Sequence, residues 1–89
     1  MNIRYNLEIY EIISYNEQEC MEILLEDVDR EEVDKVLGTK ELKSNQYYLV
    51  DELDNNKLPN GQSWIYSASG IEIDYKDLCK ELDIKEEYY

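Results

Sequence analysis

Residues 3–9, with the sequence Ile-Arg-Tyr-Asn-Leu-Glu-Ile, alternate between apolar and polar side chains at every position. A β-strand directs successive side chains to opposite faces, so this period of two is typical of a strand with one buried face. We expect the strand to continue to about Ile13. The residues on its buried face would be Ile3, Tyr5, Leu7 and Ile9.

The next apolar segment, residues 20–26, allows two interpretations. Met21, Ile23 and Leu25 occupy alternate positions, which favours a strand. Asn16 and Glu19, however, have the spacing of a capping box at the start of a helix. We favour the strand.

Two short helices are indicated by residues that can cap a first turn. Asp29 is the expected N-cap of the first helix, and Glu31 and Glu32 follow it in the first turn, where acidic side chains are favourable. Gly38 would end this helix. Asp74 is the corresponding cap of a second helix. The apolar positions of that second helix are Leu78, Cys79 and Leu82.

The middle of the chain predicts two further strands. Residues 46–50 and 64–67 are rich in aromatic and β-branched side chains, and the intervening loop at 54–62 contains the turn signal Pro-Asn-Gly. A chain of 89 residues has room for one core. We therefore predict a single α+β domain over residues 1–89, with a small antiparallel sheet of about four strands and two short helices.

The two helix entries resemble each other. Residues 27–37 align without a gap on residues 72–82, and seven of the eleven pairs are identical or conservative. With two strands before each helix, this favours a degenerate ββα-ββα duplication that buries two amphipathic helices on one sheet. The alternative is that any two capped acidic helices look alike.

Charge is the strongest feature of the composition. The chain has 22 acidic and 9 basic side chains and a net charge of −13, and Arg30 is the one basic residue among residues 8–34. Nucleic acids and anionic membranes require Lys and Arg to neutralise them, so the chain should bind neither directly and should attract basic proteins. The sequence has no apolar segment of membrane-spanning length and no signal-peptide hydrophobic region, which predicts a cytoplasmic protein.

Most catalytic chemistry is disfavoured by the residues that the chain lacks. It contains no histidine, and Cys20 and Cys79 are too far apart to form a zinc-binding motif, so we expect two buried or half-buried free thiols. The acidic loop after residue 50 fails the calcium-loop pattern, because Leu58 and Pro59 would occupy a ligand and a glycine position. We predict no enzyme activity, no catalytic residues, no metal and no cofactor.

The aromatic residues are nine Tyr and one Trp, with no Phe. Tyrosine combines a large apolar ring with a polar hydroxyl and is favoured in protein interfaces. We expect Tyr47, Tyr48, Tyr66 and Tyr75 to be ordered and partly exposed. The alternative is that they complete a small core.

Carboxylates at regular intervals on a strand or helix can imitate the phosphates of a nucleic acid. We expect Glu8, Glu22 and Glu26 to lie on one face of the sheet and to form such a track with the acids of the following helix, Asp29, Glu31, Glu32 and Asp34. The sequence thus predicts a nucleic-acid mimic that binds the basic channel of a nucleic-acid-binding protein. The predicted partner-binding residues are Glu22, Glu26, Asp29, Glu31, Glu32, Asp34, Asp51, Glu52, Asp54, Tyr47 and Tyr48.

In size, charge and tyrosine content the chain resembles the phage-encoded anti-CRISPR and anti-restriction proteins, which are small acidic inhibitors. The resemblance covers composition and no motif, so no residue is carried over from it. It implies a partner such as a Cas effector or a restriction enzyme, in a host cytoplasm. Two alternatives are a bacterial immunity protein that neutralises a cationic nuclease toxin, and a non-enzymatic adaptor whose acidity provides solubility.

Overall fold

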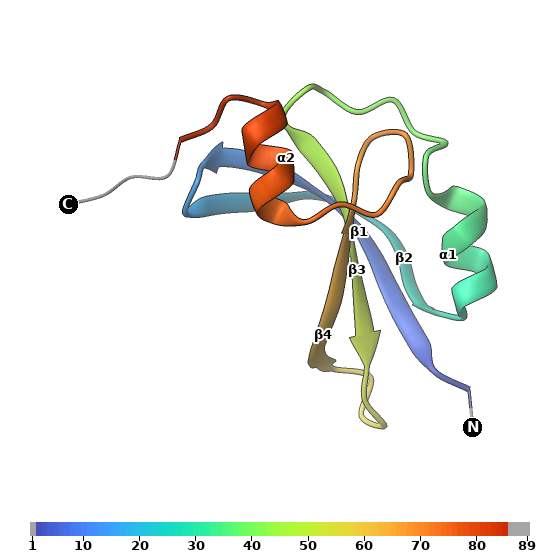
Figure 1. Ribbon diagram of the computed structural model, residues 1–89. Coiled ribbons are helices and arrows are strands. Elements are labelled where there is room, and N and C mark those ends of the chain that lie inside the picture. The colour runs from blue at the N-terminus through green and yellow to red at the C-terminus, as the bar shows by residue number, and fades with distance from the viewer. Residues whose placement is uncertain (1, 86–89) are drawn as a thin grey trace.

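The structure is a computed structural model that describes residues 2–85. The four strands form one antiparallel sheet in the order β2-β1-β3-β4, which confirms the predicted α+β class. Neither helix in the described chain is long and apolar enough to cross a membrane. The elements are β1 (Arg4–Ser14), β2 (Glu17–Val28), α1 (Arg30–Val36), β3 (Gln46–Leu53), β4 (Pro59–Tyr66) and α2 (Tyr75–Glu81) (Figure 1).

The element boundaries agree with the sequence prediction in type and differ in length. Residues 20–26 belong to the longer strand β2, so the strand interpretation is confirmed. The loop predicted at 54–62 is shorter, because Pro59, Asn60 and Gly61 already belong to β4. Strand β3 likewise extends beyond the predicted residues 46–50, to Leu53.

Both helix caps have the predicted residues. The Asp29 carboxylate accepts a hydrogen bond of 2.9 Å from the Glu32 amide and thereby satisfies one of the free N–H groups of the first turn. Gly38 follows the end of α1 with a φ of +79°, a conformation that favours glycine. At α2, the Asp74 carboxylate accepts from the Lys76 amide at 2.8 Å.

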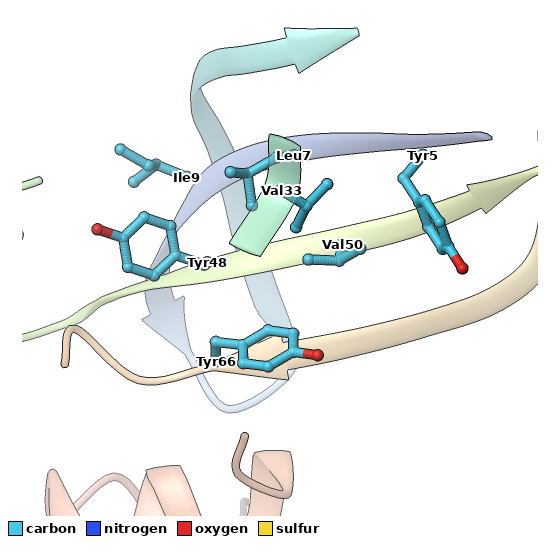
Figure 2. Close-up of a cluster of buried hydrophobic side chains, with 7 residues drawn as sticks. All are labelled: Tyr5, Leu7, Ile9, Val33, Tyr48, Val50 and Tyr66. Carbon is cyan, nitrogen blue, oxygen red and sulfur yellow. The ribbon is translucent and has the colours of Figure 1, made fainter. Parts of the chain in front are cut away.

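Two hydrophobic cores lie on opposite faces of the sheet. Leu7 is paired with Val50 and Tyr10 with Tyr47, and residues that are directly opposite in an antiparallel ladder share a face. Helix α1 covers the Leu7 face, where Figure 2 shows Val33 among the strand side chains. This first core contains Tyr5, Leu7, Ile9, Val33, Tyr48, Val50 and Tyr66. The second core, under α2, contains Ile12, Tyr47, Leu78 and Cys79.

The element order is the predicted ββαββα, but the two helices cover different faces. A rotation about an axis normal to the sheet would leave both helices on one face. Both helices pack on the one sheet, as predicted, but the two halves are not related by such a rotation, because α1 covers one face and α2 the other.

The expected exposure of three tyrosines is also wrong. Tyr47, Tyr48 and Tyr66 are 4%, 0% and 6% exposed, because a chain without phenylalanine uses tyrosine rings to fill its cores. Two of their hydroxyls have partners within the fold: Tyr48 Oη accepts from the Lys40 amide, and Tyr66 Oη accepts from the Arg30 guanidinium. Tyr75 is half-buried, as predicted.

Candidate acidic interface

The two edge strands of the sheet differ sharply in charge. Strand β2 has five acidic residues among its twelve and no lysine or arginine. Strand β4, at the opposite edge, has no charged residue. The fold therefore concentrates negative charge along one side of the sheet, where α1 follows β2 directly in the chain (Figure 1).

The carboxylates of β2 and α1 are exposed to solvent. All four glutamates of β2 are exposed. On α1, Val33 is buried, and Glu31, Glu32 and Asp34 are exposed. We call the exposed carboxylates of these two elements the acidic edge. Its members are Glu17, Glu19, Glu22, Glu26, Glu31, Glu32 and Asp34.

Ion pairs neutralise the α1 part of the acidic edge more than the β2 part. Arg30 Nε lies 3.1 Å from Asp34 Oδ1, and Lys35 Nζ lies 4.0 Å from Glu31 Oε1. Within residues 2–85, none of the four exposed glutamates of β2 forms an ion pair. The β2 side chains thus keep their charge available to a partner.

Asp27 and Asp29 have structural roles. Lys57 and Arg4 each lie 3.0 Å from an Asp27 oxygen, and their hydrogen bonds, that of Lys57 first, lower the pKa of Asp27 below its ordinary value. Asp29 caps α1. Both carboxylates are therefore already used to hold β2 and α1 in place.

The remaining predicted acids, on and after β3, lie away from the acidic edge. Glu52 Oε2 accepts a hydrogen bond of 2.6 Å from Asn60 Nδ2. The Asp54 carboxylate accepts from the Asn56 and Leu58 amides and so closes the β3–β4 turn. The structure assigns Asp54 to a turn and does not bring it together with α1.

Asp51 instead lies on the sheet face that α2 partly covers, near Glu8. Glu8 pairs with Leu49, so Glu8 and Asp51 are diagonal neighbours on adjacent strands. Burial raises the pKa of Glu8, Asp51 and Glu26 raise it further, and a 3.3 Å hydrogen bond from the Cys20 thiol opposes the shift. Glu8 and Glu26 therefore interact on one face, while α1 covers the other. Glu22 pairs with Ile9 and so lies on the α1 face, which means that the expectation of one shared face holds for Glu8 and Glu26 and is wrong for Glu22. The sheet therefore separates Glu8 from the acids of α1.

Cys20 is exposed, so the expectation of two buried or half-buried thiols holds for Cys79 and is wrong for Cys20. Cys20 lies on β2, whose outer side is uncovered. Burial and the hydrogen bond to Glu8 raise the pKa of the Cys20 thiol. A raised thiol pKa disfavours the reactive thiolate.

The pairing of β2 with β1 is irregular. Its register against β1 shifts between Tyr5 and Leu7, between Leu7 and Glu8, and again after Ile9. Bulges of this kind interrupt the row of outward backbone groups that another strand would need for pairing. A partner would therefore contact β2 through side chains.

Glu17 and Glu19 belong to the acidic edge but were not among the predicted residues. The signal that could have identified them is the polar sequence of residues 16–19, which contains no apolar side chain for a strand to bury. Tyr47 and Tyr48, which were predicted, lie in the cores and cannot touch a partner unless the fold opens.

Within residues 2–85, no three cysteine, aspartate or glutamate side chains are arranged to hold a metal ion. Comparisons with protein-family models, with curated proteins and with solved structures each find no match.

Proposed function

We propose that this chain is a protein inhibitor that binds the basic nucleic-acid-binding surface of another protein, with the acidic edge in place of the nucleic acid. The observation that carries the proposal is the asymmetry of charge between the two edge strands. Strand β2 is acidic and exposed, whereas β4 is uncharged. If the acidic residues served only solubility, they would not need to be concentrated on one edge of the sheet.

The spacing of the carboxylates supports mimicry of a polyanion. Glu17 and Glu19 are two residues apart on a strand, which separates them by roughly 6.6 Å. This spacing is close to the repeat of phosphates along a nucleic acid strand. A basic channel that neutralises phosphates with Lys and Arg can form the same ion pairs with such a row of carboxylates.

Exposed apolar side chains among the acids indicate that the partner is a protein. Met21 and Ile23 are 48% and 54% exposed on β2, where they would add apolar contact between the charged residues. Ion pairs at the rim of such an interface accelerate association and give it salt dependence. The defence nucleases of bacteria, Cas effectors and restriction enzymes, have channels of the required charge, and the cytoplasm is where the inhibitor would meet them.

Affinity capture from bacterial lysates that contain CRISPR and restriction systems tests the proposal. The tagged chain should retain a basic nucleic-acid-binding protein, identified by mass spectrometry, and release it both as salt rises and when a competing DNA or RNA is added. Capture of a cationic nuclease toxin would identify an immunity protein instead. Capture that is indifferent to salt and to nucleic acid would contradict mimicry.

A further inference from the structure

A pocket of about 350 Å³ lies between α2 and the turn that joins β1 to β2. It is separate from the acidic edge and plays no part in the function proposed above. Its lining residues are Tyr15, Lys76, Cys79, Lys80, Asp83, Ile84 and Lys85.

The end of α2 builds the apolar part of this pocket. The Ile84 amide donates a 2.8 Å hydrogen bond to the Cys79 carbonyl, and the Asp83 amide donates at 3.2 Å to the Lys80 carbonyl. Asp83 has a φ of +57°, so the chain reverses at the helix end and returns to Cys79. Cys79 is 1% exposed, and Ile84 packs against the same core.

Tyr15 forms the opposite wall. Its ring packs edge-on against the Tyr75 ring at 5.6 Å between centroids, and its backbone carbonyl accepts a 2.8 Å hydrogen bond from Tyr75 Oη. The β1–β2 turn is thereby tied to α2. Because two elements are joined in this way, the wall is held at a fixed distance from the helix.

The lining of the pocket carries more basic than acidic residues, in a protein whose net charge is −13. The charged residues of the lining are three lysines, Lys76, Lys80 and Lys85, and one acid, Asp83. Within residues 2–85, none of the three lysines forms an ion pair, although acidic residues are abundant.

Helix electrostatics do not account for this arrangement. Lys76 and Lys80 are four residues apart, so they repel each other on the surface of the helix. A lysine in the last turn complements the helix dipole, which explains Lys80, but Lys76 lies in the first turn, where a cation is unfavourable. A bound anion would relieve both the repulsion and the unfavourable position.

We propose that this pocket binds a small organic anion in which a phosphate or carboxylate is joined to an apolar ring or chain. The anionic group interacts with the lysines, and the apolar part covers Ile84 and the Tyr15 ring, which are both partly exposed. An inorganic anion alone would leave that apolar surface in water. A second copy of this chain would have to bring another net charge of −13 close to the first.

Titrations followed by the backbone amide spectrum of the full chain test this proposal with three probes: phenyl phosphate, phenol and inorganic phosphate. Phenyl phosphate should shift the amides of Tyr15 and of residues 76–85, and should bind at least about fivefold more tightly than either fragment. Equal affinity for phenyl phosphate and inorganic phosphate would contradict the proposal, because the apolar part of the ligand would then contribute nothing to binding. Shifts that do not saturate, or that spread over the whole chain, would overturn the proposal.

A matched pair of variants isolates the charge. K76Q with K80Q should weaken phenyl phosphate binding by at least about tenfold, because two charge-assisted contacts are lost. K40Q with K43Q makes the same change in net charge at exposed lysines outside the pocket, and should leave the affinity within about twofold. Thermal melts check that both variants fold. Equal losses in the two would mean that only net charge matters, which contradicts a localised site.

Discussion

Arg30 and Tyr66, which are 36 residues apart in the chain, are joined by a hydrogen bond from the Arg30 guanidinium to the Tyr66 hydroxyl. The same guanidinium lies over two tyrosine rings, 5.7 Å from the centroid of Tyr5 and 5.4 Å from that of Tyr66. Arg30 thus ties α1 to both β1 and β4. It also pairs with Asp34, so it partly neutralises the acidic edge and stabilises the fold at once.

Replacement of Arg30 by alanine should lower the free energy of unfolding by about 1–2 kcal/mol, because a hydrogen bond and two cation–π contacts are lost. R30K should recover only part of this, since lysine cannot stack and donate in the same geometry. K35A is the control, because its pair with Glu31 is exposed and should be worth less than about 0.5 kcal/mol. Urea denaturation measures all three. Equal effects of R30A and K35A would show that Arg30 does not tie the elements together.

Gly38 and Gly61 both have positive φ, at +79° and +95°, but they differ in their surroundings. A Cβ on Gly38 would lie 2.8 Å from the Ser69 carbonyl oxygen, whereas a Cβ on Gly61 would meet nothing within 4 Å. G61A should therefore cost about 1 kcal/mol from backbone conformation alone, and G38A at least about twice as much. Equal losses by urea denaturation would mean that the contact between residues 38 and 69 is absent in solution.

Glu8 should make stability depend on pH. Burial raises its folded pKa above the ordinary 4.5, so between that value and the folded pKa the folded state binds more protons than the unfolded state. Protonation of Glu8 therefore stabilises the folded state. This contribution is fully present below pH 4.5 and is lost as the pH rises through the folded pKa of Glu8.

E8Q should therefore be more stable than the native chain at pH 7, and the difference should vanish near pH 4. E19Q removes one exposed charge from the neighbouring strand and controls for net charge. Denaturation by urea at the two pH values provides the comparison. An E8Q variant that is less stable than the native chain at pH 7 would contradict the assigned burial of the carboxylate.

Local patterns in the sequence were sufficient to predict the element types. The alternation of residues 3–9 identified β1, and Asp29 and Asp74 identified the helix starts, because each signal depends on immediate neighbours along the chain. The alternation could not be followed past Ile9. Ile9 and Ile12 are both buried although they are three residues apart, since one faces α1 and the other faces α2.

The candidate site was predictable only in part, for the same reason. A run of acids in the sequence does not show which face of a sheet each one occupies. The sequence alone therefore groups Glu8 with Glu22, although Glu22 pairs with Ile9 on the face that α1 covers. Tyrosine is common at interfaces, which predicts an interface role for Tyr47 and Tyr48. Their burial depends on two helices that cover both faces, which no local pattern reveals.

The most direct test of the central claim is a comparison of two charge-reversed variants in binding to the partner obtained by capture. E22K with E26K changes the acidic edge, and D77K with E81K makes an equal change in net charge on α2, where both residues are exposed. The first pair should weaken binding by at least about tenfold and reduce its salt dependence, whereas the second should stay within about threefold of the native chain. Equal weakening by both pairs in folded protein would contradict the account, because the partner would then respond to net charge and not to the acidic edge.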